Sequence, residues 1–61
     1  MKGLQPKGIA RRNKMLLAAI QLFLEQGYEK TTTAQIARAA GMSPTSFFAA
    51  FENKEALLLT L

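Results

Sequence analysis

Residues 32–51 read TTAQIARAAGMSPTSFFAAF, and this stretch decides the fold. Thr32 and Gln35 have the spacing of a capping box, in which the threonine hydroxyl accepts a bond from the third amide of a helix and the glutamine side chain bonds back to the cap. A short helix of about seven residues should follow this box. Gly41 then ends the helix, because glycine adopts the positive φ of a helix end without steric cost.

A second short helix is expected directly after the turn at Gly41. Ser43 is a favourable N-cap, and Pro44 loses no hydrogen bond in the first helical position, so the helix should cover about residues 44–50. Ala37 is small enough for the two helices to cross closely. The wedge between them would be filled by apolar side chains: Ile36, Met42 and Phe47. Two helices joined in this way form a helix-turn-helix, here over about residues 33–51, whose second helix enters the major groove of DNA.

Helices are also expected on both sides of this motif. Nothing breaks a helix over about residues 9–26, where apolar residues recur with a helical period, and Gly27 ends it. After the motif, Asn53 can cap a fourth helix that begins at Lys54 and is still running at the end of the chain. The predicted fold class is all-α: a three-helix homeodomain-like bundle with a helix-turn-helix, plus the start of a fourth helix. This domain would occupy residues 9–61, after a flexible basic arm over residues 1–8.

The composition excludes several classes of function. A chain of 61 residues forms one small domain, and it contains no histidine, cysteine or aspartate. Its four glutamates are dispersed, so we expect no metal site, no cofactor and no nucleophile–base pair, and hence no enzyme. No stretch reaches the roughly 18 apolar residues of a membrane span, and no signal-type cleavage site follows the first apolar run. We therefore expect a cytoplasmic protein without a membrane partner.

The charge is concentrated at the start of the chain. Five of the eight basic residues fall before residue 15, where no acidic residue occurs. A basic segment of this kind favours an anionic partner, either nucleic acid or, less often, an acidic membrane surface. Contacts with such a partner would come from Lys7, Arg11 and Arg12. The simpler alternative is a solvated tail that only aids solubility.

The outward side of the second motif helix carries small uncharged residues: Pro44, Thr45, Ser46 and Ala49. A helix face that only meets water more often carries lysine and glutamate. Small hydroxyl and methyl groups let a helix lie deep in a groove and contact phosphates and thymine methyl groups. The alternative is a three-helix miniature in which such residues have no ligand.

Residues 15–58 resemble the N-terminal DNA-binding domain of TetR-family transcriptional repressors. The resemblance rests on matching residues in a family-specific order and spacing: Ala18-Ala19, Leu22-Phe23, Gly27-Tyr28, Thr31-Thr32, Ile36-Ala37, Ala40-Gly41-Met42-Ser43, Phe51, Lys54-Glu55 and Leu57.

The resemblance implies a set of DNA contacts. It places Thr33 at a phosphate, with Thr32 holding the start of that helix, and it makes residues 44–50 the recognition helix. The residues nearest the bases would be Pro44, Thr45, Ser46 and Ala49, with Ser43 as their helix cap. Lys54 resembles the family lysine that pairs with the DNA backbone, although a plain surface lysine is the alternative. The family commonly has tyrosine at the position of Phe48, which keeps the ring but loses the hydroxyl that bonds a phosphate.

The resemblance also implies partners. The chain would be the DNA-reading head of a ligand-responsive regulator, a repressor, on a palindromic double-stranded operator. The full-length protein would be a homodimer that binds a small-molecule effector through a C-terminal domain absent from this chain. The alternative function is a small helical protein-interaction module that uses the apolar residues near the C-terminus, 56–61.

Overall fold

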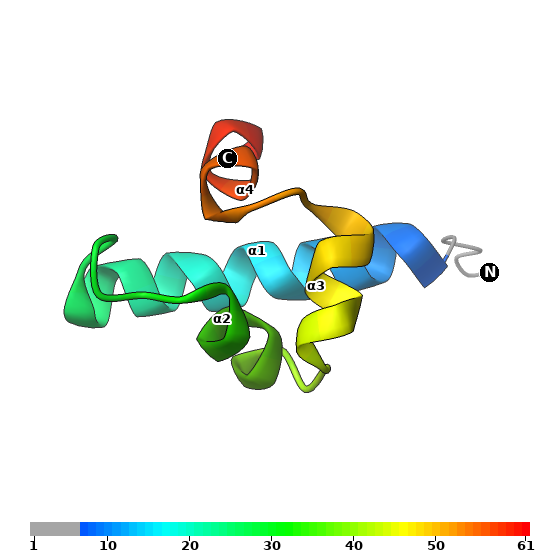
Figure 1. Cartoon of the computed structure of the whole chain (residues 1–61), viewed down its shortest axis with the longest axis horizontal. Coiled ribbons are helices and arrows are strands. Elements are labelled where there is room, and N and C mark those ends of the chain that lie inside the picture. Colours follow the sequence, from blue (N-terminus) through cyan, green and yellow to red (C-terminus); the bar gives the residue numbers. More distant parts are fainter. Residues whose placement is uncertain (1–6) are drawn as a thin grey trace, which may run out of the picture.

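The computed structural model describes residues 7–61, with side chains from Ala10 onward, and this part of the chain consists of four helices without a strand (Figure 1). They are α1 (Lys7–Gln26), α2 (Thr33–Ala39), α3 (Pro44–Ala50) and α4 (Lys54–Thr60). The long α1 forms the spine, and α2 and α3 pack against it and against each other. In the view of Figure 1, α4 lies across α1 from α2. The predicted all-α fold class is confirmed.

The helix boundaries follow the caps. Thr32 and Gln35 form the predicted capping box: the Gln35 amide donates to the Thr32 hydroxyl over 3.1 Å, and the Thr32 amide donates to the Gln35 side-chain oxygen over 3.0 Å. Ser43 caps α3 and Pro44 is its first residue. Asn53 caps α4, accepting from the Ala56 amide over 2.7 Å. Each cap satisfies a helix amide that has no intrahelical partner.

Helix α1 begins at Lys7, two residues earlier than predicted. The sequence predicts an arm over residues 1–8 because Gly3, Pro6 and Gly8 are typical of loops and turns. The structure has Gly8 in the first turn of a helix of 20 residues, long enough to tolerate one weak helix former. Residues 1–6, the rest of the predicted arm, lie outside the described residues.

The core lies where α1, α2 and α3 meet. Six side chains from all four helices are completely buried: Met15, Ala19, Ile36, Ala37, Phe47 and Leu57. Ile36 and Ala37 of α2 are buried in one cluster with Phe47 of α3, and the partly buried Met42 packs against this cluster from the turn. The predicted wedge between the motif helices is therefore confirmed. Leu57 is the one completely buried residue of α4.

Both glycines that end a helix have positive φ. Gly27 has a φ of 94° after α1, and Gly41 has a φ of 80° in the turn between α2 and α3. After Gly27, the ring of Tyr28 folds back onto Phe23, with the ring centroids 5.1 Å apart. These turns reverse the chain within a few residues and so fix how α2 and α3 lie on α1.

None of the helices in residues 7–61 is long and apolar enough to cross a membrane.

Candidate nucleic-acid interface

Helix α3 buries one face and presents the other to solvent. Phe47 is completely buried, whereas Thr45, Phe48 and Ala49 are exposed. These three residues have the i, i+3, i+4 spacing of a single helical face, and we call them the α3 face. Pro44 is exposed beside them at the start of the helix. Four of the residues predicted to lie near DNA bases or backbone are thus brought together on one accessible surface.

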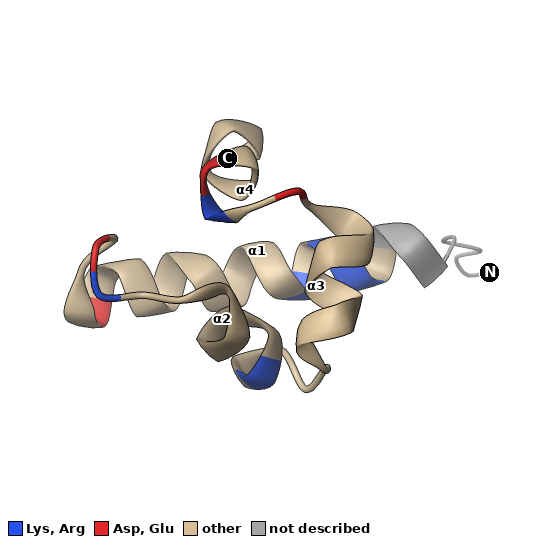
Figure 2. Cartoon of the chain, viewed as in Figure 1, with Lys and Arg blue, Asp and Glu red and all other residues tan. Residues whose placement is uncertain are grey.

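The α3 face carries no charge. Figure 2 shows α3 without any basic or acidic residue, while basic residues colour the N-terminal half of α1, the end of α2 and the start of α4. The helix sequence PTSFFAA contains neither a charged nor an amide side chain. The functional groups that α3 offers to a partner are therefore methyl groups, one aromatic ring and hydroxyls.

The two serines of this region bond to each other and to the helix end. The Ser43 hydroxyl accepts from the Ser46 amide over 3.4 Å, and the two hydroxyl oxygens also lie 3.4 Å apart. Ser46 is half-buried. The predicted role of Ser43 as a helix cap is confirmed. Among the hydroxyls of α3, that of Thr45 is on the exposed face.

The start of α2 is held by a network that the sequence analysis missed. The Gln26 side-chain amide donates to the Gln35 side-chain oxygen over 2.8 Å and to the Lys30 carbonyl over 3.3 Å. It also lies 3.3 Å from the hydroxyl of the buried Thr31, which itself donates to the Gly27 carbonyl over 2.8 Å. The end of α1 is thus bonded to the capping box of α2, where the half-buried Thr33 is the first helical residue.

Lys54 has a partner inside the domain. Its ammonium donates to the Tyr28 carbonyl oxygen over 2.6 Å and lies 4.0 Å from the centroid of the Tyr28 ring. The side chain therefore joins the first residue of α4 to the turn that follows α1. This role is absent from both interpretations offered by the sequence, a phosphate contact or a plain surface lysine.

Replacement of Lys54 by methionine tests this contact. The substitution keeps most of the aliphatic stem and removes the charge, so it should lower the free energy of unfolding by about 1–2 kcal/mol through loss of the charged hydrogen bond and the cation–π contact. Urea unfolding followed by circular dichroism measures the change. Lys30→Met, at an exposed lysine, is the matched control and should leave stability within about 0.5 kcal/mol. Equal midpoints for Lys54→Met and the parent would show that the contact contributes no stability.

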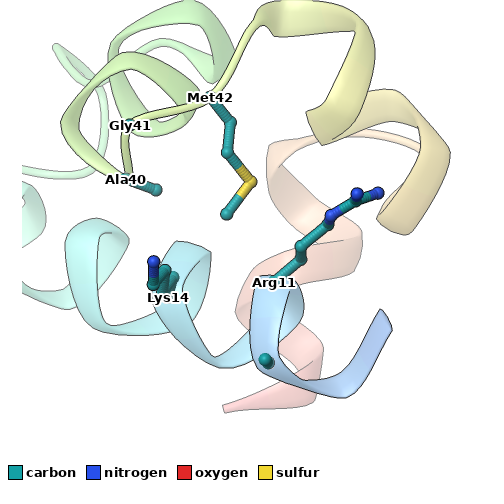
Figure 3. Close-up of a pocket in the computed structure, with 6 residues that line it drawn as sticks. Arg11, Lys14, Ala40, Gly41 and Met42 are labelled. Carbon is teal, nitrogen blue, oxygen red and sulfur yellow. The ribbon is translucent and has the colours of Figure 1, made fainter. Parts of the chain in front are cut away.

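A basic cleft lies beside the turn of the helix-turn-helix. It has a volume of about 260 Å³ and is lined from α1 by Ala10, Arg11 and Lys14 and from the turn by Ala40, Gly41 and Met42. Figure 3 shows the Met42 side chain extending from the turn toward α1, between Arg11 and Lys14. Two cations thus flank an apolar floor, and Met42 is only two residues before the start of α3. The predicted contact Arg11 lies here; Lys14 was not predicted.

The other two basic residues predicted to contact an anionic partner are Arg12 and Lys7. The Arg12 guanidinium lies over the ring of Phe51, 5.3 Å from its centroid, at the end of α3. Lys7 is the first residue of α1, and its side chain lies outside the described residues. Arg11 and Arg12 therefore bracket the two ends of α3 from α1.

Within the part of the chain that the structure describes, no group of three or more His, Cys, Asp or Glu residues could hold a metal ion.

Known proteins share this sequence pattern. The family described as bacterial regulatory proteins, tetR family, matches residues 15–61, which include the whole helix-turn-helix and α4. No solved structure matches the chain.

Three relatives illustrate the match. The transcriptional regulator TcmR of Streptomyces glaucescens is 44% identical over 59 residues, which cover 95% of this chain and 26% of the relative. The transcriptional repressor Rv1474c of Mycobacterium tuberculosis is 40% identical over 52 residues, 85% of this chain and 28% of the relative. The regulator HbdR of Aromatoleum sp. is 46% identical over 52 residues, 84% of this chain and 23% of the relative.

All three carry the helix-turn-helix designation in their names, and the chain spans about a quarter of the length of each. The helix-turn-helix geometry and the match over residues 15–61 agree. The chain therefore belongs to the TetR family of bacterial helix-turn-helix transcriptional regulators.

Proposed function

We propose that this chain binds double-stranded DNA sequence-specifically, with α3 in the major groove as the recognition helix. The observation that carries the proposal is the α3 face, an accessible and uncharged helical surface with basic side chains at both ends. Arg11 lies beside the turn that precedes α3, and Arg12 lies over Phe51 at its end. Neutral side chains approach base edges without a desolvation penalty for charge, while the flanking cations meet phosphates.

The phosphate contacts in this proposal come from residues of the other three helices. Thr33 opens α2, Lys54 opens α4, and Lys7 and Arg11 lie in the first two turns of α1. Lys54 can serve both the domain and the DNA, because an ammonium has three donors and the Tyr28 carbonyl occupies one of them. The Phe48 ring lies on the α3 face without a hydroxyl for the backbone. Thr33, Lys54, Lys7 and Arg11 would position the helix, whereas the α3 face, which includes Phe48, would meet the bases.

The wider role follows from the family. We propose that the protein acts in the cytoplasm as a repressor, because the relative from Mycobacterium tuberculosis is named a transcriptional repressor. It would bind a palindromic operator as a homodimer. In a protein as long as these relatives, about three-quarters of the length would lie outside this chain. A small-molecule effector would bind there and change the distance between the two DNA-binding domains of the dimer.

Selection from a random pool of double-stranded DNA tests the proposal. The 61-residue chain would be fused to a dimerising coiled coil, and recovery of a palindromic motif is the expected result. Binding measured by fluorescence anisotropy should weaken steeply with salt, with a log–log slope of several units. A protein-interaction module that uses the exposed leucines of α4 would instead recover no motif, show little salt dependence and self-associate. Those results would overturn the proposal.

Lys54→Ala gives a second measurement. If Lys54 contacts a phosphate, the substitution should weaken binding about equally for all sequences and lower the salt slope by about one unit. The variant is compared with Lys30→Ala at a temperature where both are fully folded, so that the stability effect of the Tyr28 contact does not enter. An unchanged salt slope would assign Lys54 to the fold alone.

A further inference from the structure

The chemistry of the α3 face limits which features of a base pair it can recognise. Guanine and adenine are usually read by arginine, lysine, asparagine or glutamine, which bond to the purine edge in the major groove. Helix α3 contains none of these residues. Its exposed face offers the Thr45 methyl and hydroxyl, the Phe48 ring and the Ala49 methyl. Cytosine, which presents a donor, also finds no carboxylate there.

One base presents an apolar group in the major groove. The C5-methyl group of thymine is contacted by alanine, the threonine methyl and phenylalanine, and these are the three residue types of the α3 face. Their i, i+3, i+4 spacing puts them on one helical face, so the three can meet neighbouring base steps together. Burial of a methyl group against carbon is favourable because both surfaces leave water.

The Phe48 ring is held in place for such a contact. It is 55% exposed, yet its inner side packs against the buried Phe47 ring in an edge-to-face arrangement with centroids 5.3 Å apart. The exposed ring adds apolar area to a face that already carries methyl groups and no charge. Because the ring lacks a hydroxyl, it can offer a partner only its carbon surface.

We propose that the α3 face recognises thymine methyl groups, so that the bound half-site contains thymine at the positions facing Thr45, Phe48 and Ala49. The proposal rests on the proposed function, since it requires α3 to lie in the major groove. It names the base class that this domain selects and the contact that selects it.

Uracil substitution tests the proposal directly. Deoxyuridine pairs as thymidine does and lacks only the methyl group. In the selected site, each contacted thymine is replaced singly by uracil, and binding of the dimerised chain is measured by anisotropy. Each replacement should weaken binding about fourfold, the affinity equivalent of one buried methyl-sized group. Thymines elsewhere in the same duplex provide the internal control and should show no change.

Protein variants identify the side chain. In Phe48→Ala, uracil should no longer weaken binding at the one position that Phe48 contacts. At the other positions uracil should still weaken binding about fourfold. Leu24→Ala removes an even more exposed apolar side chain from α1, 83% exposed, and should leave every uracil effect unchanged. Ala49→Gln should shift the preferred base at one position toward adenine, which glutamine bonds through two atoms. Circular dichroism confirms that each variant is folded.

The outcomes separate this proposal from the proposed function. A selected motif without thymine at the contacted positions, or a motif in which uracil binds as well as thymine, overturns the methyl reading and leaves sequence-specific binding intact. Absence of any motif overturns the proposed function itself. A uracil effect that persists unchanged in Phe48→Ala and in Thr45→Ser and Ala49→Gly also contradicts the α3 face as the reader.

Discussion

Replacing Phe47 with alanine should unfold most of the domain. Phe47 is completely buried in the core, and its ring packs at a tilt against that of Phe51 with the centroids 5.6 Å apart. Truncating a buried phenylalanine to alanine typically costs about 3–5 kcal/mol, because the transfer free energy is lost and a cavity remains. A chain of this length has a total stability of about 3–9 kcal/mol. The expected loss is therefore comparable with the whole stability of the fold.

The neighbouring phenylalanine provides a matched control. Phe48→Ala removes the same side chain from the exposed face of the same helix and should cost about 1 kcal/mol or less, mainly the edge contact with Phe47. Thermal unfolding followed by circular dichroism compares the two variants with the parent. Similar melting temperatures for Phe47→Ala and Phe48→Ala would contradict the assignment of opposite faces to these adjacent residues.

The second large effect is expected at Gly41. A Cβ added at this position would meet no atom within 4 Å, so a substitution creates no clash with the rest of the domain. The φ of 80° remains, and a β-branched residue is strained there. Gly41→Val should therefore lower the free energy of unfolding by about 1–3 kcal/mol, purely through the backbone. Denaturant unfolding measures this change.

Asparagine separates conformation from size at this turn. Asparagine tolerates the left-handed region better than other non-glycine residues, so Gly41→Asn should cost clearly less than Gly41→Val although the side chains are similar in size. If both substitutions cost the same, the loss does not come from φ. If neither changes the denaturation midpoint, the turn relaxes to another conformation and Gly41 is not required for it.

Local signals account for what the sequence predicted well. The bounds of α2 and α3 depend on Thr32, Gly41 and the Ser43-Pro44 pair, whose effects act within one helical turn and can be read without knowing the tertiary structure. The buried and exposed faces of α3 also follow from residue spacing alone. Phe47 continues the apolar pattern of the core, whereas Thr45 and Ala49 lie outside that pattern. The exposure of Pro44, Thr45 and Ala49 was therefore predictable, whereas Ser46, placed on the same side, is half-buried.

Tertiary contacts account for what the sequence did not predict. Lys54 and Tyr28 are 26 positions apart, and no local pattern indicates that the ammonium meets that carbonyl. Gln26 joins α1 to the α2 capping box through side chains whose meeting depends on the angle of the turn at Gly27. Lys14 enters the basic cleft only because α1 lies beside the α2–α3 turn. Such contacts follow from the packing of helices, which single-sequence spacing does not specify.

The contact between Lys54 and Tyr28 also bears on the order in which the chain folds. Helices α1 to α3 are joined by short turns and bury side chains in one another, so they can form early through contacts close in sequence. Helix α4 has one completely buried residue, Leu57, and its bond to Tyr28 closes a long loop only after the end of α1 has formed. We therefore expect docking of α4 to be the last step of folding and its release to be the first step of unfolding. We also expect the amide hydrogens of α4 to exchange with solvent before those of α1, α2 and α3, which should keep their arrangement while α4 opens.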